Sequence, residues 1–169
     1  SSKMSTNYKF VIALCGIKAL DEKMISWLYF LINKDDSLRV YLKPHPILPI
    51  HKLRNFDIKI FKDRISVLNG NIRNILEKTE ILITSGPTSI IYESVVYGCK
   101  LFYLYLDPCD KILKSNTSIT KKSFVFIKNK NDFLNQIKRW KEKKHIKVNS
   151  NLKNKFYTKI NDKNLKIFF

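Results

Sequence analysis

The stretch "ILITSGPTSIIYES", Ile81–Ser94, decides the fold class of this chain. Residues 81–84 form an apolar and β-branched run, which is typical of a strand buried on both faces of a sheet. Gly86 and Pro87 end that strand, and the apolar residues that follow have helical spacing up to Gly98. A buried strand that turns directly into a helix is the repeating unit of parallel α/β sheets.

The same alternation of strand and helix patterns continues on both sides of this unit. Apolar runs predict further strands at residues 9–17, 37–43, 64–70, 100–106 and 123–128. Apolar residues at helical spacing predict helices at residues 19–33, 71–80, 88–98 and 131–145, with Asn71 as an N-cap. We therefore expect an α/β fold: one Rossmann-like parallel sheet with helices on both faces.

The predicted domain spans residues 9–145, after a polar N-terminal extension at residues 1–8 and before a basic C-terminal helix or tail at residues 146–169. A length of 169 residues and a hydrophobic content of 44 % suit one domain with its own core. No apolar run approaches the roughly 18 residues of a membrane span. The polar start "SSKMSTNY" does not have the pattern of a signal peptide.

The three cysteines, Cys15, Cys99 and Cys109, are odd in number and lack the spacing of metal ligands. We interpret them as free thiols in a reducing compartment, which predicts a cytoplasmic protein without a structural metal.

The net charge of +18 is unevenly distributed along the chain. Residues 1–110 carry 15 Lys and Arg against 11 Asp and Glu, whereas residues 111–169 carry 17 against 3. An anionic partner would explain this asymmetry, namely a membrane surface, a polyanionic glycan or a nucleic acid. A codon bias toward Lys, Asn and Ile would explain it equally well. Residues 138–147 combine basic residues with Trp140. Two interpretations of this segment stay open: it binds an anionic partner, or it is a solvated helix whose aromatic residue packs on the domain.

In open parallel sheets, ligands bind beyond the carboxyl ends of the strands, so the loops at these ends are the candidate site. The first such loop is "KPHP", residues 43–46. Pro44 and Pro46 keep Lys43 and His45 extended. The imidazole of His45 is therefore expected at the mouth of the sheet, where it can donate to a phosphate or a carboxylate. A surface turn with a satisfied histidine is the alternative.

The second loop is "SGPTS", residues 85–89. Gly86 lets a ligand approach the backbone closely. Ser85, Thr88 and Ser89 offer hydroxyl groups where the predicted helix begins, which favours an anion site without a charged side chain. Ordinary N-capping, for which one hydroxyl is enough, is the alternative. The loop is neither a Walker A motif nor a dinucleotide fingerprint.

The two motifs His45-Pro46 and Thr88-Ser89 together resemble those of the donor-nucleotide domain of GT-B glycosyltransferases, over roughly residues 10–108. The likeness is strongest to bacterial sialyl-, polysialyl- and Kdo transferases of surface-polysaccharide synthesis, which use CMP-sugars. It implies a role in capsule or lipopolysaccharide synthesis, with a nucleotide-sugar donor and a glycan or lipid-linked acceptor, in the cytoplasm or at the inner face of the membrane. Because GT-B enzymes have two Rossmann-like domains, it also implies that an N-terminal acceptor domain is missing from this chain.

The resemblance assigns roles to individual residues. It implies that His45 is catalytic and stabilises the leaving nucleotide, while Thr88 and Ser89 bind the same phosphate without a metal. Glu93 is expected either to reach the ribose or to be an ordinary surface residue. The residues predicted to bind the donor nucleotide are Gly16, Lys43, His45, Pro46, Asn69, Gly70, Ser85, Gly86, Thr88, Ser89 and Glu93.

Other interpretations stay open at this point. Asp21 and Glu22 are expected to be acids of a first helical turn rather than general bases. A CDP-glycerol or UDP-sugar transferase domain is an alternative, and so is a non-catalytic basic module that binds nucleic acid or another polyanion.

Overall fold

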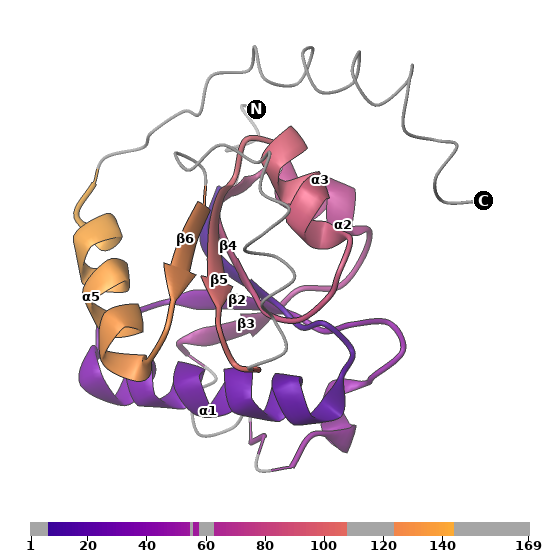
Figure 1. Ribbon diagram of the computed structural model, residues 1–169, viewed down its shortest axis with the longest axis horizontal. Helices are drawn as coiled ribbons and strands as arrows, with labels where there is room; N and C mark the ends of the chain where they lie inside the picture. The colour runs from indigo at the N-terminus through magenta and orange to yellow at the C-terminus, as the bar shows by residue number, and fades with distance from the viewer. Residues whose placement is uncertain (1–6, 55, 58–62, 108–123, 144–169) are drawn as a thin grey trace.

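The computed structural model of the chain describes residues 7–54, 56–57, 63–107 and 124–143. Six strands form one parallel sheet in the order β3-β2-β1-β4-β5-β6 (Figure 1). The strands are β1 (Tyr8–Ala13), β2 (Val40–Lys43), β3 (Ile65–Val67), β4 (Thr79–Thr84), β5 (Lys100–Leu104) and β6 (Phe124–Ile127). This is the Rossmann order, in which the chain builds outward from β1 to one side and then to the other. The predicted fold class is confirmed.

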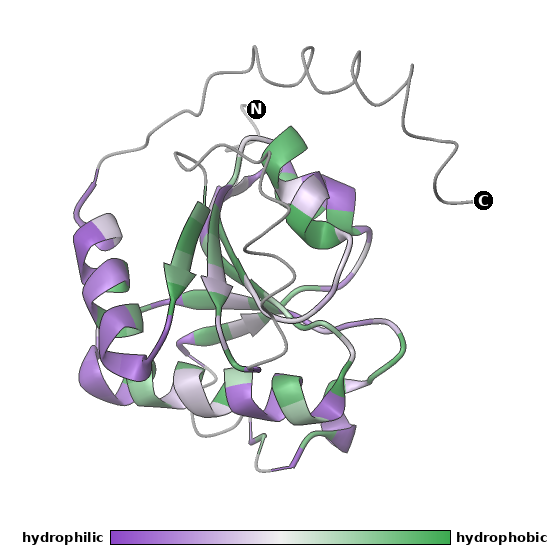
Figure 2. Ribbon diagram, viewed as in Figure 1, coloured by the Kyte–Doolittle hydropathy of each residue, from purple (hydrophilic) through white to green (hydrophobic). Residues whose placement is uncertain are grey.

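Helices cover both faces of the sheet, as the sequence predicts. One face packs against α1 (Lys18–Lys34) and α5 (Lys130–Lys141), and the other against α2 (Ile72–Leu76) and α3 (Ile90–Val96) (Figure 1). A short 3-10 turn, η1 (Ile50–Lys52), follows β2. Figure 2 shows that apolar residues concentrate in the strands, while α5 is polar over most of its visible surface.

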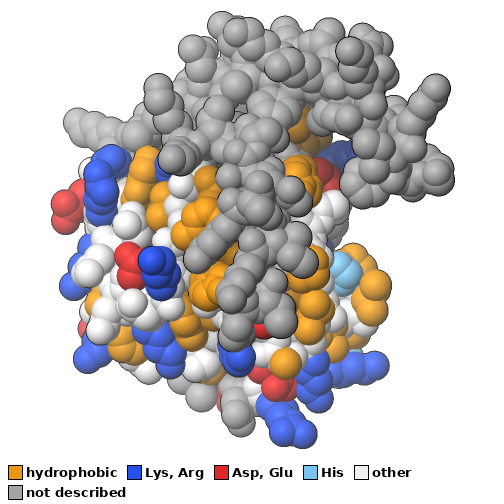
Figure 3. Space-filling model, in the orientation of Figure 1, with side chains coloured by type: hydrophobic (Ala, Val, Ile, Leu, Met, Phe, Trp, Pro, Cys, Tyr) orange, Lys and Arg blue, Asp and Glu red, His pale blue; other side chains and the backbone are white. Residues whose placement is uncertain are grey.

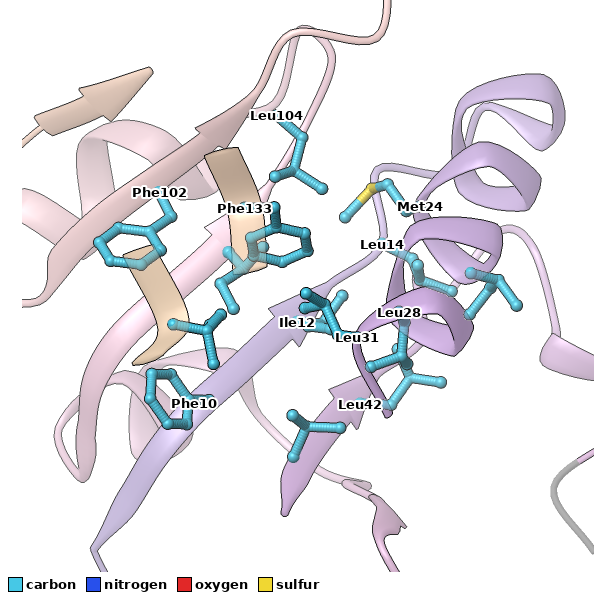
Figure 4. Close-up of a cluster of buried hydrophobic side chains, with 14 of the residues drawn as sticks. Phe10, Ile12, Leu14, Met24, Leu28, Leu31, Leu42, Phe102, Leu104 and Phe133 are labelled. Carbon is cyan, nitrogen blue, oxygen red and sulfur yellow. The ribbon is translucent and has the colours of Figure 1, made fainter. Parts of the chain in front are cut away.

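The central strand β1 supplies side chains to two separate cores. Phe10 and Ile12 pack in the core under α1 and α5 (Figure 4), and Val11 and Ala13 pack in the core under α2 and α3. Successive strand residues point to opposite faces, so the part of a strand that lies between two helical layers needs apolar residues at successive positions. This requirement explains the uninterrupted apolar runs that identify the strands in the sequence.

Several element ends differ from the sequence prediction. β1 ends at Ala13, before the predicted end at residue 17, because the chain turns at Gly16, whose φ is +84°. α3 begins at Ile90, after the predicted start at residue 88. Asn71 is the predicted N-cap of α2, and its side chain accepts a hydrogen bond from the Arg73 N–H at 2.9 Å.

Cys15 and Cys99 are buried free thiols, as predicted, and Cys109 lies outside the described residues. The predicted C-terminal helix or tail also lies outside them. None of the helices in the described ranges combines the length and apolar character that crossing a membrane requires.

Candidate functional site

Four loops at the carboxyl edge of the sheet carry the predicted site residues. They follow β1, β2, β3 and β4, and the strand order places the loops after β2, β1 and β4 next to one another. Three of the four loops contain a glycine with positive φ: Gly16, Gly70 and Gly86.

His45 packs directly on Gly16. A Cβ atom added to Gly16 would lie 2.6 Å from Nδ1 and 2.9 Å from Cγ of the His45 ring, so the space above this glycine is filled by the imidazole. The Nδ1 atom of His45 accepts a hydrogen bond from the Ile47 N–H at 3.3 Å. A ring whose Nδ1 accepts in this way carries its proton on Nε2, which leaves Nε2–H as the donor toward a ligand.

Gly86 packs on the same β1 loop. A Cβ atom on Gly86 would lie 3.2 Å from Cys15 Sγ and 2.9 Å from Leu20 Cδ1. The Gly86 N–H donates to the Tyr103 hydroxyl at 3.0 Å. Residues 15 and 16 therefore contact both the His45 loop and the Gly86 loop, so the two loops that carry the sequence motifs both pack on the β1 loop.

Asp21 is fully buried beneath this junction, and sequence reasoning missed its role. Its Oδ1 accepts a hydrogen bond from the Cys15 N–H at 2.8 Å, and its Oδ2 accepts one from the Gly16 N–H at 3.0 Å. Asp21 does lie in the first turn of α1, as predicted. The overlooked signal is that Asp21 shares the apolar stripe of α1 with Met24, Ile25 and Leu28, and a charged residue in such a stripe calls for an explanation.

The Cys15 thiol is part of the same buried cluster, and its Sγ lies 3.3 Å from Asp21 Oδ1. Burial, with a smaller contribution from the neighbouring Asp21 carboxylate, raises the pKa of the Cys15 thiol to about 12. The thiol is therefore protonated at neutral pH, so Cys15 packs as a small apolar group.

The stretch "TSGPTS", residues 84–89, carries four hydroxyl groups, and the first two form hydrogen bonds within the protein. Thr84 Oγ1 donates to the Ala13 carbonyl at 2.9 Å, and Ser85 Oγ donates to the Leu104 carbonyl at 2.8 Å. Both residues are fully buried. Each hydroxyl joins β4 or its loop to a neighbouring strand, so these groups hold the sheet edge in shape.

The last two hydroxyls of the stretch lie outside the core, since Thr88 is half-buried and Ser89 is exposed. Ser89 Oγ donates to Glu93 Oε1 at 3.3 Å and does not cap α3. The N–H groups of Thr88, Ser89 and Ile90 have no hydrogen-bond acceptor within the described part of the chain. Consecutive N–H groups of this kind are suited to an anionic ligand.

The β3 loop is linked to this region through Glu93. Glu93 Oε2 lies 3.9 Å from Nε of Arg73, near the start of α2 and just after Asn69 and Gly70. Asn69 and Gly70 are both exposed, and a Cβ atom added to Gly70 would meet nothing within 4 Å. This part of the edge is open.

Lys43 and Pro46 complete the predicted site residues. Lys43 is half-buried and its Nζ donates to the Pro44 carbonyl at 3.2 Å, while Pro46 is exposed. In the ranges that the structure describes, no group of three His, Cys, Asp or Glu side chains could hold a metal ion.

The basic segment at residues 138–147 is described only up to residue 143. Trp140 packs edge-on against Phe102, with the Lys143 Nζ 4.4 Å from the centre of the indole ring. Lys141 Nζ donates to both carboxylate oxygens of Asp35, at 2.9 and 2.8 Å. The aromatic residue and this lysine are thus part of the folded domain. On the face seen in Figure 3, Lys and Arg side chains are dispersed among hydrophobic and neutral ones.

Comparison with known proteins gives a likeness of fold. No family model and no curated protein matches the sequence. The structure entitled "Crystal structure of GtfA/B complex" is similar over 92 % of this chain and 33 % of that chain, with a TM-score of 0.57 and 14 % identity. The spinosyn rhamnosyltransferase SpnG complexed with thymidine diphosphate is similar over 92 % of this chain and 42 % of that chain, with a TM-score of 0.55 and 13 % identity.

The chain therefore has the fold of one half of a GT-B glycosyltransferase and spans less than half the length of each of these two proteins. The GT-B architecture expected from the sequence is confirmed at this level. The CMP-sugar subgroup and the roles of the individual site residues stay predictions.

Proposed function

We propose that this chain is the donor-binding domain of a glycosyltransferase, and that its donor is a CMP-linked sugar of the sialic acid or Kdo type. The observation that supports the proposal is the contact of residues 15 and 16 with both motif-bearing loops, because Gly16 packs on His45 and Cys15 packs on Gly86. His45 belongs to one of the two motifs that resemble those of CMP-sugar transferases, and Gly86 lies two residues before the other, at the edge where sheets of this class bind ligands.

The proposed chemistry is stabilisation of the leaving nucleotide. When the bond between the sugar and the nucleotide breaks, negative charge grows on the nucleotide phosphate. The Nε2–H of His45 would donate to this phosphate, and the hydroxyl and N–H groups of Thr88 and Ser89 would donate from the neighbouring loop. Donors that are already fixed in place lower the barrier because they need no reorganisation during the reaction. We propose that these donors carry out the transfer without a metal.

The rest of the nucleotide would occupy the open part of the edge. Glu93 is held between Ser89 and Arg73 and keeps acceptor capacity on its carboxylate for the ribose hydroxyls. The exposed loop at Asn69 and Gly70 would offer backbone groups to the base.

The acceptor side of the reaction would come from a second domain, since the chain spans only 33 % and 42 % of the two proteins with the same fold. That domain would supply the general base and bind a glycan or lipid-linked glycan acceptor in capsule or lipopolysaccharide synthesis. Asp21 is poorly suited to act as a base because it is buried and its two oxygens accept backbone hydrogen bonds.

The direct test is thermal unfolding with CMP, CDP, UDP and TDP, all at one concentration that is about a hundredfold above the dissociation constant of the tightest-binding nucleotide. At that excess, a ligand that binds only the folded state adds about 2.7 kcal/mol of stability, or roughly 5–10 °C in Tm for a domain of this size, and a weaker ligand adds less. We expect CMP to give the largest shift, and EDTA to leave that shift unchanged.

Variants assign the shift to the site. His45→Ala, and the double change Thr88→Ala with Ser89→Ala, should abolish it, whereas His51→Ala should retain it. His51 is the matched control because it is an exposed histidine in η1, outside the contact with Gly16. A larger shift with CDP or UDP would transfer the proposal to a CDP-glycerol or UDP-sugar donor. The absence of a shift with all four nucleotides would remove the proposal.

A further inference from the structure

We infer that Asp21 is a positioning residue for the donor site: its carboxylate fixes residues 15 and 16 and thereby sets the spacing between His45 and the loop that starts at Gly86. This inference deepens the proposed function and rests on it. It gives a task to a fully buried ionisable side chain that the proposed chemistry does not otherwise use.

A buried carboxylate needs a reason to be retained. Removing a charged group from water is costly, and polar partners only partly offset that cost. The position of Asp21 on the apolar stripe of α1 would accept a leucine or a methionine by pattern alone. The carboxylate instead accepts hydrogen bonds from Cys15 N–H, Gly16 N–H and the Cys15 thiol.

These bonds reach out of the helix. The N-cap position of α1 is Ile17, which has no side-chain cap, and the two amides bound by Asp21 belong to the residues before it. An acid that only stabilised the helix start would interact with the free N–H groups of the first turn. Asp21 stabilises the loop that precedes the helix.

Each of the two fixed residues contacts a different loop. Gly16 adopts a φ of +84° and lies so close to the His45 ring that a Cβ atom would come within 2.6 Å of Nδ1. Cys15 Sγ lies 3.2 Å from the position of a Cβ atom on Gly86. One carboxylate therefore controls both contacts, and a shift of the loop would move His45 relative to Gly86 and the Thr88 and Ser89 groups after it.

The test compares Asp21→Asn with Asp36→Asn by ¹H–¹⁵N NMR of the whole chain without ligand. Asparagine has nearly the volume of aspartate, but its amide nitrogen cannot accept, so one of the two N–H groups loses its partner. The control, Asp36, has an exposed side chain that pairs with Arg64. We expect Asp21→Asn to shift the His45 ring signals and the Gly86 amide signal, while Asp36→Asn leaves both in place. A folded Asp21→Asn protein with unchanged His45 and Gly86 signals would overturn the inference.

A second measurement uses the unmodified protein and decides the matter if Asp21→Asn does not fold. The amides of Cys15 and Gly16 lie in a loop, yet their bonds to a buried carboxylate should protect them from hydrogen exchange to the level of the adjoining strand. Exchange of the Gly16 amide at the rate of an open loop would overturn the inference.

CMP titration separates this inference from the proposed function. We expect Asp21→Asn to weaken CMP binding at least tenfold, and Asp36→Asn to leave it unchanged. If the unmodified protein binds no nucleotide but the NMR coupling is present, the proposed function fails and Asp21 still sets the loop geometry. If the unmodified protein binds CMP and Asp21→Asn alters neither binding nor the signals, the inference fails and the proposed function stands.

Discussion

The polar groups at the carboxyl edge of the sheet form two layers that use the same kinds of residue in different ways. The inner groups are fully buried and each is hydrogen-bonded within the protein, namely Asp21, Thr84 and Ser85. The outer groups are half-buried or exposed, namely His45, Thr88 and Ser89. A threonine and a serine occur in each layer, within six residues of sequence, so depth in the fold and not residue type separates the two tasks.

The difference has an energetic side. Removing one partner of a buried hydrogen bond leaves a desolvated polar group and costs about 1–3 kcal/mol. Substitutions at the surface usually change stability by less than about 0.5 kcal/mol. Changes in the inner groups should therefore appear in the free energy of unfolding, and changes in the outer groups should appear in ligand binding.

The largest effect is expected for the chemical reactivity of Cys15, which is buried beside the inner group Asp21. With its pKa raised from 9.0 to about 12 by burial, the thiolate fraction at pH 8 is about a thousandfold below that of an ordinary cysteine. Iodoacetamide should therefore leave Cys15 unmodified in the folded protein and modify it in urea, as followed by peptide mass spectrometry. Modification of the folded protein at the rate of a small-molecule thiol would contradict the burial of the Cys15 thiol.

The next effect concerns two glycines with similar backbone conformations and different surroundings. Gly86 has φ +76° and Gly70 has φ +97°, so alanine is strained at both, by about 1–2 kcal/mol. At Gly86 the new Cβ atom also meets Leu20 and Cys15, which adds about 1–3 kcal/mol of overpacking, whereas at Gly70 it meets nothing. Urea denaturation should show Gly86→Ala to be clearly less stable than Gly70→Ala. Equal losses of stability for the two variants would mean that Gly86 does not pack against Leu20 and Cys15 in solution.

A smaller difference in the free energy of unfolding is expected between variants of two serines in the "TSGPTS" stretch. Ser85→Ala removes a buried hydrogen bond to the Leu104 carbonyl, but this carbonyl keeps the Leu106 N–H at 3.0 Å. The loss should be about 1 kcal/mol, at the low end of the usual range. Ser89→Ala should stay within about 0.5 kcal/mol of the unmodified protein in the same urea experiment. The distinction between inner and outer groups would be wrong if Ser89→Ala proved the more costly of the two changes.

The smallest effect lies away from the edge, at the Asp35–Lys141 pair that joins α1 to α5. The hydrogen bond from Lys141, with a second from Ser37, lowers the pKa of Asp35 below its ordinary value of 3.8. A carboxylate with a lowered pKa stabilises the folded state above its unfolded pKa, and this stabilisation disappears as the pH falls through the folded pKa.

Asp35→Asn should therefore cost up to about 1 kcal/mol at pH 7, because Lys141 is partly exposed and the pair is weakened by solvent. The difference from the unmodified protein should narrow below about pH 4, as measured by urea unfolding at a series of pH values. Asp36→Asn is the exposed control and should show little difference at any pH. A gap for Asp35→Asn that widened in acid would contradict the assignment.

The sequence predicts the fold well for a physical reason. The buried part of a strand with helices on both faces is apolar at successive positions, so the central residues of β1 and β4 stand out as apolar runs. Local turn chemistry also predicts Asn71 as an N-cap and the end of α3 near Gly98, whose φ is +74°.

The division of the polar groups at the sheet edge into buried and exposed ones could not be predicted in the same way. Thr84 bonds to Ala13 and Ser85 bonds to Leu104, and these partners are far away along the chain. No local pattern records such contacts, so all the hydroxyls of "TSGPTS" look equivalent in the sequence. The fully buried position of Asp21 likewise becomes evident only when α1 packs on the sheet.

The contrast between Gly16 and Gly70 also bears on how this site can change in evolution. The loop at Gly16 touches the His45 ring directly and is bonded to Asp21, so an inserted residue would displace two neighbours at once. The loop at Gly70 has free space around it. We expect insertions and deletions among related chains to accumulate at Asn69–Gly70 and to be absent at Cys15–Gly16, so that the length of the β3 loop is the variable part of an otherwise fixed edge.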